Sequence, residues 1–356
     1  MRCSEPALMD FCAGVMEKAG LPPEDAETFA ASLVGSEMRG VPSHGITRLK
    51  AYFDRIRLGQ VRPAAELSLV NGDQPGSTLL LDGNNGPGVT VAAKAMDRCL
   101  ERAGEGGVCF AAVRNTSHAA AGWFYVQRAA ARGMIGLSVC NTNPLTAPFG
   151  SGKPMLGTNP ISIAIPADRH PGLLLDMATS AAARGKVDLY AKLGKPLPDG
   201  WIVDQYGRPS NNPADLLLGA MLPFGGVKGY GLALIIDIVA SALSGAKNGR
   251  QITSFFNSPD PEGFKNIGLF MGALDVRKFL PLDLFKERVD GILDEFKRCP
   301  PAPGTAEVMI PGEIEHRNLL RARADGIDVP DNLLEELRSL AAIRSLPDPF
   351  ARPGDA

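Results

Sequence analysis

Residues 108–140, VCFAAVRNTSHAAAGWFYVQRAAARGMIGLSVC, decide the fold class. The apolar runs at 108–113 and 135–140 are typical of strands, and the alanine-rich stretch His118–Arg132 between them is typical of a helix. A strand–helix–strand mixture of this kind indicates an α/β fold in which helices pack on a mixed sheet. Further strands are predicted at 67–70, 78–82, 161–166, 173–178 and 267–274, and further helices at 89–103, 182–193, 229–244 and 282–296.

Both ends of the chain are predicted to be mainly helical. Two helices open the chain, the second from Pro22–Asp25, where prolines and acids suit a first helical turn. A third covers Ile46–Leu58, and two more begin near Gly312 and Asp331, after a strand-like run EVMIP at 307–311. We therefore expect one helical unit from residues 1–65 and 282–356, and one mixed α/β domain over 66–281.

Composition and charge exclude several classes of protein. The chain has 356 residues, 45% apolar and 21% charged, with a net charge of −2, which is ordinary for a globular protein. The charge offers no basic footprint for nucleic acid. The most apolar run, Gly231–Ala246, is too short to span a membrane.

The cysteines and the N-terminus predict the compartment. Six scattered cysteines include no C-x-x-C pair and no zinc-like arrangement with histidine, so we expect free thiols and no metal site. The N-terminal stretch is typical of an amphipathic helix and not of a signal peptide. These features favour a cytoplasmic protein.

Three glycine clusters resemble nucleotide-binding motifs and fail them. GSGKP at 150–154 lacks the P-loop spacing, and GGVKGYG at 225–231 lacks the spacing of the dinucleotide fingerprint. GEGGVC at 104–109 has Cys109 at the third glycine position and leads into a strand. A nicotinamide cofactor would therefore have to bind without the ordinary Rossmann signal.

His44 lies in Pro42-Ser43-His44-Gly45, just before a predicted helix that carries Arg48 and Tyr52. If the helix begins near His44, steps of four place these three side chains along one face. A histidine that moves a proton beside an arginine that binds a carboxylate suits the interconversion of 2-oxo and 2-hydroxy acids. The spacing is equally explained if His44 caps the helix and Arg48 pairs with a surface acid.

Other candidates each have two interpretations. His118 follows a strand, in Asn115-Thr116-Ser117-His118, where it could belong to a site or to a helix cap. Asp176 ends a strand and could bind ribose hydroxyls or cap the next segment. Lys228, between glycines, could reach a phosphate or face solvent. His170 is expected to be solvated, and the place of His316 stays open.

Seven segments taken together resemble the second type of the malate/L-lactate dehydrogenase family, which is unrelated to the Rossmann lactate dehydrogenases. They occur in the family's order and cover most of the chain. They are RGVPSHGITRL (39–49), NTSH (115–118), APFGSGKPMLGTNP (147–160), LDMATSAAARGK (175–186), LPDGWIVDQYGRPSNNP (197–213), LPFGGVKGYGLAL (222–234) and Pro-Gly (311–312).

The resemblance implies a fold, a cofactor and a set of site residues. It implies a non-Rossmann domain that binds NAD or NADP, a small carboxylate substrate and a homodimer. His44 matches the proton donor, although His118 has that role in some members, and Arg48 matches the arginine near the substrate carboxylate. Tyr52 and Thr158 are expected near the substrate. Cofactor contacts are implied at Thr142, Asp176, Met177, Ala178, Lys228, Gly312, Glu313 and Ile314.

One departure leaves the substrate open. Many members follow the second histidine with Phe-Gly, whereas this chain has Ala119-Ala120, with Trp123 nearby. The predicted activity is an NAD(P)H-dependent interconversion of a small 2-oxo acid and its 2-hydroxy acid. Reduction of a cyclic 2-imino acid, and cofactor binding without turnover, are the alternatives.

Overall fold

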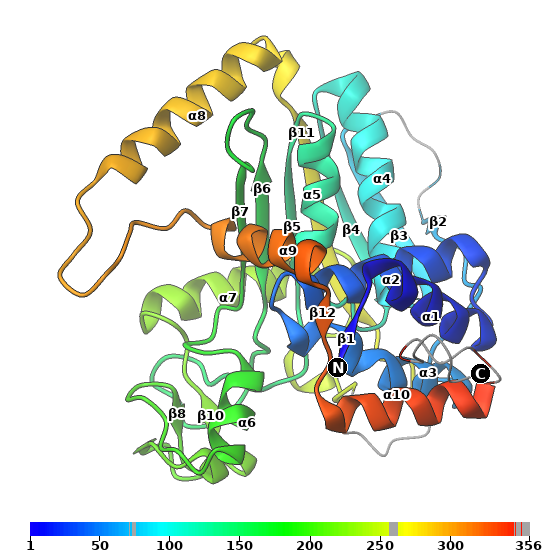
Figure 1. Cartoon of the computed structure of the whole chain (residues 1–356), viewed down its shortest axis with the longest axis vertical. Coiled ribbons are helices and arrows are strands. Elements are labelled where there is room, and N and C mark those ends of the chain that lie inside the picture. Colours follow the sequence, from blue (N-terminus) through cyan, green and yellow to red (C-terminus); the bar gives the residue numbers. More distant parts are fainter. Residues whose placement is uncertain (71, 73–75, 256–262, 345, 347–349, 351–356) are drawn as a thin grey trace.

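A seven-stranded mixed sheet forms the centre of the computed structural model, which describes residues 1–70, 72, 76–255, 263–344, 346 and 350 (Figure 1). The strand order is β2-β3-β4-β11-β5-β6-β7, in which β3 and β4 pair in parallel and the other neighbours are antiparallel. The strands are β2 (Ser68–Leu69), β3 (Thr78–Gly86), β4 (Val108–Thr116), β5 (Met134–Cys140), β6 (Ile161–Ile165), β7 (Leu173–Met177) and β11 (Ile267–Asp275).

Helices pack on both faces of this sheet. On one face, α4 (Gly88–Gly106) and α5 (Trp123–Ala131) bury alternate strand residues such as Ala111 and Met271. On the other face lies α7 (Val227–Ser241), which can approach β11 closely because Gly268 has no Cβ; a Cβ there would lie 1.9 Å from the Ala240 carbonyl oxygen. The prediction of an α/β fold with helices on a mixed sheet is confirmed.

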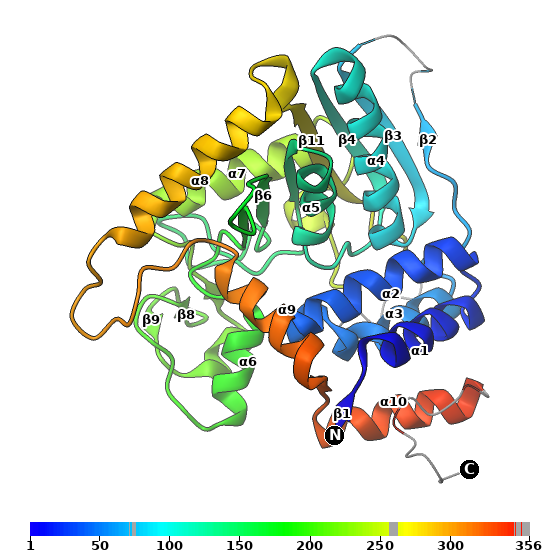
Figure 2. The same ribbon diagram turned by 45° about the horizontal axis from the view of Figure 1, so that its top comes forward.

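Both ends of the chain contribute to one helical core (Figure 2). Leu8, Phe29, Phe53 and Leu337 are buried together in it. The elements around this core are α1 (Glu5–Lys18), α2 (Pro23–Met38), α3 (Leu49–Arg57), α9 (Glu313–Asp325) and α10 (Asp331–Arg344), with the strand pair β1 (Arg2–Cys3) and β12 (Ile327–Asp328). The domain boundaries at 65 and 282 remain predictions.

The remaining elements lie around the sheet. A small sheet of β8 (Ile202–Val203), β9 (Pro209–Ser210) and β10 (Ala220–Met221) packs with α6 (Arg184–Lys192). Helix α8 (Leu282–Arg298) is tied to the β6–β7 turn, because the Asp290 carboxylate accepts hydrogen bonds from the backbone N–H groups of Arg169 and His170. The short 3₁₀ helices are η1 (Pro42–His44), η2 (Ile46–Arg48), η3 (Pro213–Leu217), η4 (Gly249–Gln251) and η5 (Val276–Lys278).

Two local predictions are wrong. The segment 307–311 is not a strand: Pro311 has no N–H, and its carbonyl accepts one backbone hydrogen bond, from Leu174 of β7. The helix predicted from His118 begins at Trp123, since Ala120 has φ +50°, which no right-handed helix contains. In the described part of the chain, no helix is long and apolar enough to cross a membrane.

Candidate functional site

His44 and Arg48 lie on a tightly turned loop between α2 and α3. The loop consists of η1, Gly45 and η2, and α3 begins only at Leu49. The prediction that His44, Arg48 and Tyr52 share one face of a single helix is therefore wrong, because Gly45 has extended backbone angles that interrupt the turns. The Arg48 Nε donates to the carbonyl of Ser43 at 2.8 Å, which folds the arginine back toward His44.

The last turn of α2 holds this loop in place. The Glu37 carboxylate accepts a hydrogen bond from the Ile46 N–H at 3.1 Å. Ile46 is the first residue of η2, between His44 and Arg48. Gly45 lies against the same carboxylate, and a Cβ at position 45 would lie 2.1 Å from Glu37 Oε2. Residue 45 must therefore be glycine for Glu37 to reach the Ile46 amide.

His118 follows the end of β4 and is fixed by the start of α4. The Ser117 hydroxyl donates to the Gly86 carbonyl at 3.1 Å and accepts from the Gly88 N–H at 2.8 Å. A Cβ at Gly88 would lie 2.5 Å from the His118 carbonyl oxygen, so the two backbones touch. Because α5 begins at Trp123, His118 does not cap that helix.

These two loops bring the predicted catalytic residues together. The rings of His44 and His118 stack with centroids 5.8 Å apart and planes 14° from parallel. The Tyr52 hydroxyl lies 2.5 Å from His118 Nδ1. Tyr52 itself is 3% exposed, so it contacts His118 from within the core. The structure thus unites His44, His118, Arg48 and Tyr52 in one cluster.

Electrostatics keep both histidines neutral near pH 7. Burial, and next the positive charge of Arg48, lowers the pKa of His44 to about 4. Burial, followed by the charges of His44 and Arg48, holds the pKa of His118 well below its usual range. Burial raises the pKa of Tyr52 above its ordinary value, so its hydroxyl keeps its proton. In this form His44 can accept a proton.

Several of the predicted cofactor residues gather around the end of β7. Asp176 is exposed, and its two carboxylate oxygens accept from the Ser162 hydroxyl at 2.7 Å and the Trp123 N–H at 2.9 Å. Desolvation by the surrounding protein raises the pKa of Asp176, although both hydrogen bonds act against it. Gly312 packs on the same strand: it has φ +92°, and a Cβ there would lie 2.7 Å from Leu174 Cβ.

Thr142 and Thr158 lie on two loops that are locked together. The Thr142 hydroxyl accepts from the Thr158 N–H at 3.0 Å, and the Thr142 N–H donates to the Asn159 side chain at 3.2 Å. The Thr158 carbonyl accepts from the Thr179 N–H at 2.8 Å, just after β7. The Thr179 carbonyl in turn accepts a hydrogen bond from the Phe224 N–H at 3.0 Å. Phe224 lies shortly before Lys228 in the chain, so this bond connects the threonine loops to the start of α7.

The other predicted cofactor residues differ in how their side chains are used. Lys228 is exposed in the first turn of α7, and Ile314 is exposed in the first turn of α9. The Glu313 carboxylate is engaged by Lys297 and Arg317 and accepts from the Ile310 N–H, so its side chain stabilises the start of α9. Met177 and Ala178 continue from Asp176 at the end of β7 and are half-buried.

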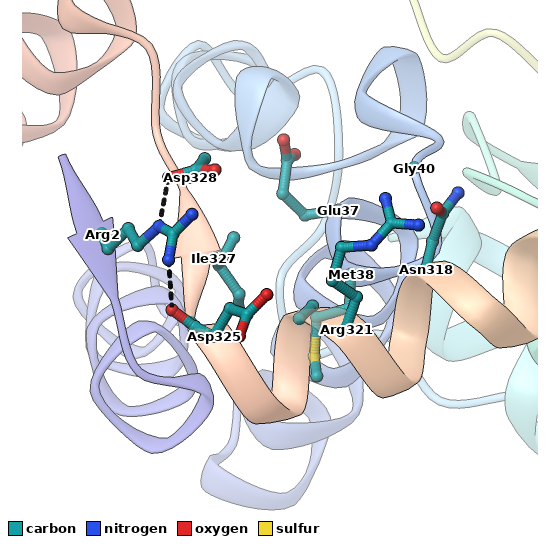
Figure 3. Close-up of a pocket in the computed structure, with 11 residues that line it drawn as sticks. Arg2, Glu37, Met38, Gly40, Asn318, Arg321, Asp325, Ile327 and Asp328 are labelled. Carbon is teal, nitrogen blue, oxygen red and sulfur yellow. Dashed lines mark hydrogen bonds and ion pairs between the residues drawn. The ribbon is translucent and has the colours of Figure 1, made fainter.

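A separate pocket of about 190 Å³ lies between the end of α2, α9 and the β1–β12 pair (Figure 3). Arg2 pairs with Asp328 across its wall and donates to the Asp325 carbonyl. Glu37 lines this pocket as well, with its carboxylate turned away from Asp325 (Figure 3). None of the residues predicted for the site lines it, and Glu37 connects it to the histidine loop through the Ile46 N–H.

Sequence reasoning missed three residues of the site. Phe255 is 3% exposed, stacks on His118 with ring centroids 5.8 Å apart, and contacts the ring of Tyr52 in a tilted arrangement at 5.5 Å. Asn159, fully buried with φ +30°, connects the two threonine loops. Glu37 braces the histidine loop. Asparagine tolerates positive φ, so the Asn159-Pro160 pair was a sequence signal for an unusual backbone turn. Nothing in the sequence points to Phe255.

Among the described residues, no cluster of His, Cys, Asp and Glu could hold a metal ion.

Comparisons with known proteins identify the family of the chain. The sequence model of the malate/L-lactate dehydrogenase family matches residues 3–338. L-sulfolactate dehydrogenase of Methanocaldococcus jannaschii is 39% identical over 92% of both chains. Ureidoglycolate dehydrogenase (NAD(+)) of Escherichia coli K12 is 32% identical over 99% of this chain and 100% of its own. (2R)-3-sulfolactate dehydrogenase (NADP(+)) of Chromohalobacter salexigens is 33% identical over 94% and 96%.

The match to solved structures covers the chain as completely as the sequence matches do. A solved structure of the sulfolactate dehydrogenase from Methanocaldococcus jannaschii matches with a TM-score of 0.91, covering 98% of both chains at 36% identity. The sequence match and the structural match therefore both extend along nearly the whole chain. The chain belongs to the malate/L-lactate dehydrogenase family and is a dehydrogenase.

Proposed function

We propose that this protein interconverts a small 2-hydroxy acid and its 2-oxo acid with NAD or NADP as cofactor. The observation that carries the proposal is the stacked His44–His118 pair with Arg48 bonded into the same loop. A fixed guanidinium beside a titratable ring provides the two functions that this reaction requires of a protein, carboxylate binding and proton transfer.

The residues around the end of β7 fit a nicotinamide cofactor. Asp176 offers an exposed carboxylate that can accept hydrogen bonds from ribose hydroxyls, and Lys228 offers an exposed cation for phosphate. Thr142, Met177, Ala178, Gly312, Glu313 and Ile314 are proposed to complete the contacts. A nicotinamide cofactor held by these residues would supply the hydride acceptor for oxidation and the hydride donor for reduction at C2. The relatives named for NAD(+) and for NADP(+) support either cofactor.

The chain's own residues supply the acid–base chemistry. Arg48 binds the substrate carboxylate, which orients C2. Tyr52 and Thr158 are proposed to lie near the substrate, Tyr52 through its contact with His118. During oxidation the C2 hydroxyl transfers its proton to neutral His44 as the C–H bond breaks, and during reduction the same proton returns to the forming alkoxide. The low pKa of His44 provides the neutral base that oxidation needs.

The substrate class is proposed from the site and from the relatives together. The small side chains of Ala119 and Ala120 follow His118 and are proposed to shape the substrate pocket, and the relatives are named as dehydrogenases of sulfolactate and ureidoglycolate. The test is NAD(P)H oxidation with pyruvate, oxaloacetate, sulfopyruvate, oxidised ureidoglycolate and piperideine-2-carboxylate. Turnover of one of the first four supports the proposal. Turnover of the imine alone reassigns the enzyme as an imine reductase, and cofactor binding without turnover on any substrate contradicts the proposal.

We also propose that the protein is a homodimer that forms through the sheet face opposite α4 and α5. Phe110, Phe270 and Ile163 project from this face and are only half-buried or exposed. On the adjacent α7, Ile235 is 59% and Ile238 is 51% exposed. Exposed apolar side chains gathered on one side of a molecule are characteristic of an interface between subunits.

The cytoplasm is the proposed compartment. All six cysteines are free, including Cys3, Cys12, Cys99 and Cys109, which are buried. Unpaired thiols persist in a reducing environment. Localisation of the tagged full-length chain by cell fractionation tests this proposal, and recovery in an oxidising compartment would contradict it.

A further inference from the structure

The ring of His118 is contacted at Nδ1 by two groups of the protein. The backbone N–H of Ala120 donates to Nδ1 at 3.2 Å, and the Tyr52 hydroxyl lies 2.5 Å from the same atom. A peptide N–H can only donate a hydrogen bond, so Nδ1 must present its lone pair to it. A neutral imidazole carries one proton, and that proton is therefore left for Nε2.

The backbone around His118 is shaped to make this contact. Ala120 has φ +50°, a left-handed conformation that is unfavourable for a residue with a Cβ. This conformation turns the chain back so that the N–H of residue 120 reaches the ring of residue 118. The Tyr125 hydroxyl, which donates to the Ala119 carbonyl, holds the turn from the other side. Strain of this kind persists where the surroundings impose it and is concentrated at functional sites.

Tyr52 is equally fixed. Its ring packs edge-on against Phe29 with centroids 4.9 Å apart and lies 5.5 Å from the ring of Phe255. A neutral phenol can donate or accept a hydrogen bond. Because His118 Nδ1 accepts from the Ala120 N–H, its lone pair is available to the Tyr52 hydroxyl, which therefore donates to the same nitrogen. The low pKa of His118 agrees with a ring that stays neutral while these two donors face it.

We propose that Tyr52 and the Ala120 N–H hold His118 as the Nε2–H tautomer, so that His118 donates a hydrogen bond to a substrate oxygen while His44 alone exchanges the proton. This inference rests on the proposed dehydrogenase function for the identity of the substrate. In the oxidation step the C2 hydroxyl proton goes to His44, the hydride with its electron pair goes to the cofactor, and the Nε2 proton of His118 stays on its nitrogen. Tyr52 is a positioning residue, since it acts through His118.

The tautomer can be measured without any enzyme activity. Long-range ¹H–¹⁵N correlation spectra of the protein labelled with ¹⁵N-histidine distinguish a protonated from an unprotonated ring nitrogen, and the His118→Gln variant identifies the His118 signals. We expect Nε2 protonated and Nδ1 unprotonated from pH 8 to pH 5. We expect Tyr52→Phe to mix the two tautomers. A ring protonated on Nδ1, or on both nitrogens, in the wild type would overturn the proposal.

Steady-state kinetics test separately whether His118 donates a hydrogen bond to the substrate. Removing one preorganised donor costs about 10²–10³ in kcat, which is the effect expected for His118→Leu. In His118→Gln the amide N–H replaces the donor, so we expect recovery to within about tenfold of wild type. Neither variant should shift the acid limb of the pH profile.

The matched control is His170→Gln, because His170 bonds to Asp294 on α8 and lies outside the cluster. It should behave as the wild type. If His118→Gln is as inactive as His118→Leu and the acid limb disappears in both, His118 is the base and the proposal is overturned. If no substrate turns over at all, the proposed function fails while the tautomer measurement still stands.

Discussion

Arg48 is held by its bond to the Ser43 carbonyl, and its charge lowers the pKa of both neighbouring histidines. A guanidinium can bind a carboxylate through two parallel N–H bonds, whereas a lysine ammonium cannot reproduce that geometry. We expect Arg48→Lys to raise KM for the carboxylate substrate by about tenfold or more, with a smaller effect on kcat. Initial-rate kinetics measure this split, and an unchanged KM would place Arg48 outside the substrate site.

The pH dependence of the reaction follows from the pKa of His44. Oxidation requires the neutral ring, so kcat/KM for oxidation rises as pH rises through the His44 pKa and is level above it. Because burial and Arg48 lower that pKa to about 4, oxidation should be nearly constant from about pH 5 to pH 8. Reduction requires the protonated ring, so its kcat/KM should fall with rising pH over the same range. An acid limb of oxidation near pH 6.5 would contradict this assignment.

Single residues differ in how far the sequence could predict them. Spacing made His44, His118 and Arg48 candidates and left a capping role open, the family resemblance selected them as site residues, and the structure unites them with Tyr52. The argument from one helix face was nevertheless wrong, since Gly45 breaks the turns and the arginine returns through Ser43. Phe255, more than a hundred residues from His118 along the chain, could not be predicted because only the tertiary fold places it on the ring.

Among the elements, the loop 42–48 depends on the last turn of α2. The Glu37 carboxylate bonds to the Ile46 N–H, and one such bond contributes about 1 kcal/mol. We expect Glu37→Ala to lower kcat about five- to tenfold with cofactor affinity retained, since the loop carries His44 and Arg48 and no predicted cofactor contact. Glu37→Gln keeps an acceptor for the amide and should restore most of the rate.

The control for the Glu37 variants is their melting temperature, which shows whether a lower rate comes from a less stable protein. Equal losses of rate in Glu37→Ala and Glu37→Gln, or a loss explained by a fall in melting temperature, would remove Glu37 from the positioning of the loop. Gly45→Ala should act like Glu37→Ala, because the added methyl would lie 2.1 Å from Glu37 Oε2.

The sequence predicted most elements but not all of their ends. Short apolar runs located β4 and β5 within a few residues, and the predicted helical stretches 89–103 and 282–296 located α4 and α8 equally well. The start of α5 was placed too early because alanine favours helix locally, whereas the contacts of Ala120 with His118 override that preference. The strand order was not predictable: β11 enters between β4 and β5 from far along the chain, with no local signal.

For the whole molecule, the proposed dimer makes a direct prediction. A charge in the centre of an apolar interface is costly, so Ile238→Asp should shift the protein from dimer to monomer. Leu58→Asp is the matched control, because Leu58 is 66% exposed at the end of α3, away from this face. Sedimentation velocity measures both variants. A wild-type protein that sediments as a monomer, or a dimer insensitive to Ile238→Asp, would contradict the proposed interface.

The central claim is that the molecule is a 2-hydroxy acid dehydrogenase in which His44 exchanges the proton. Its most direct test is kcat/KM for NAD(P)-dependent oxidation as a function of pH, measured for the wild type and His44→Gln with cofactor binding as the control. We predict that the variant binds cofactor normally, is slower by about 10²–10⁴ and loses the acid limb. Wild-type turnover and an unchanged pH profile in His44→Gln would contradict the claim.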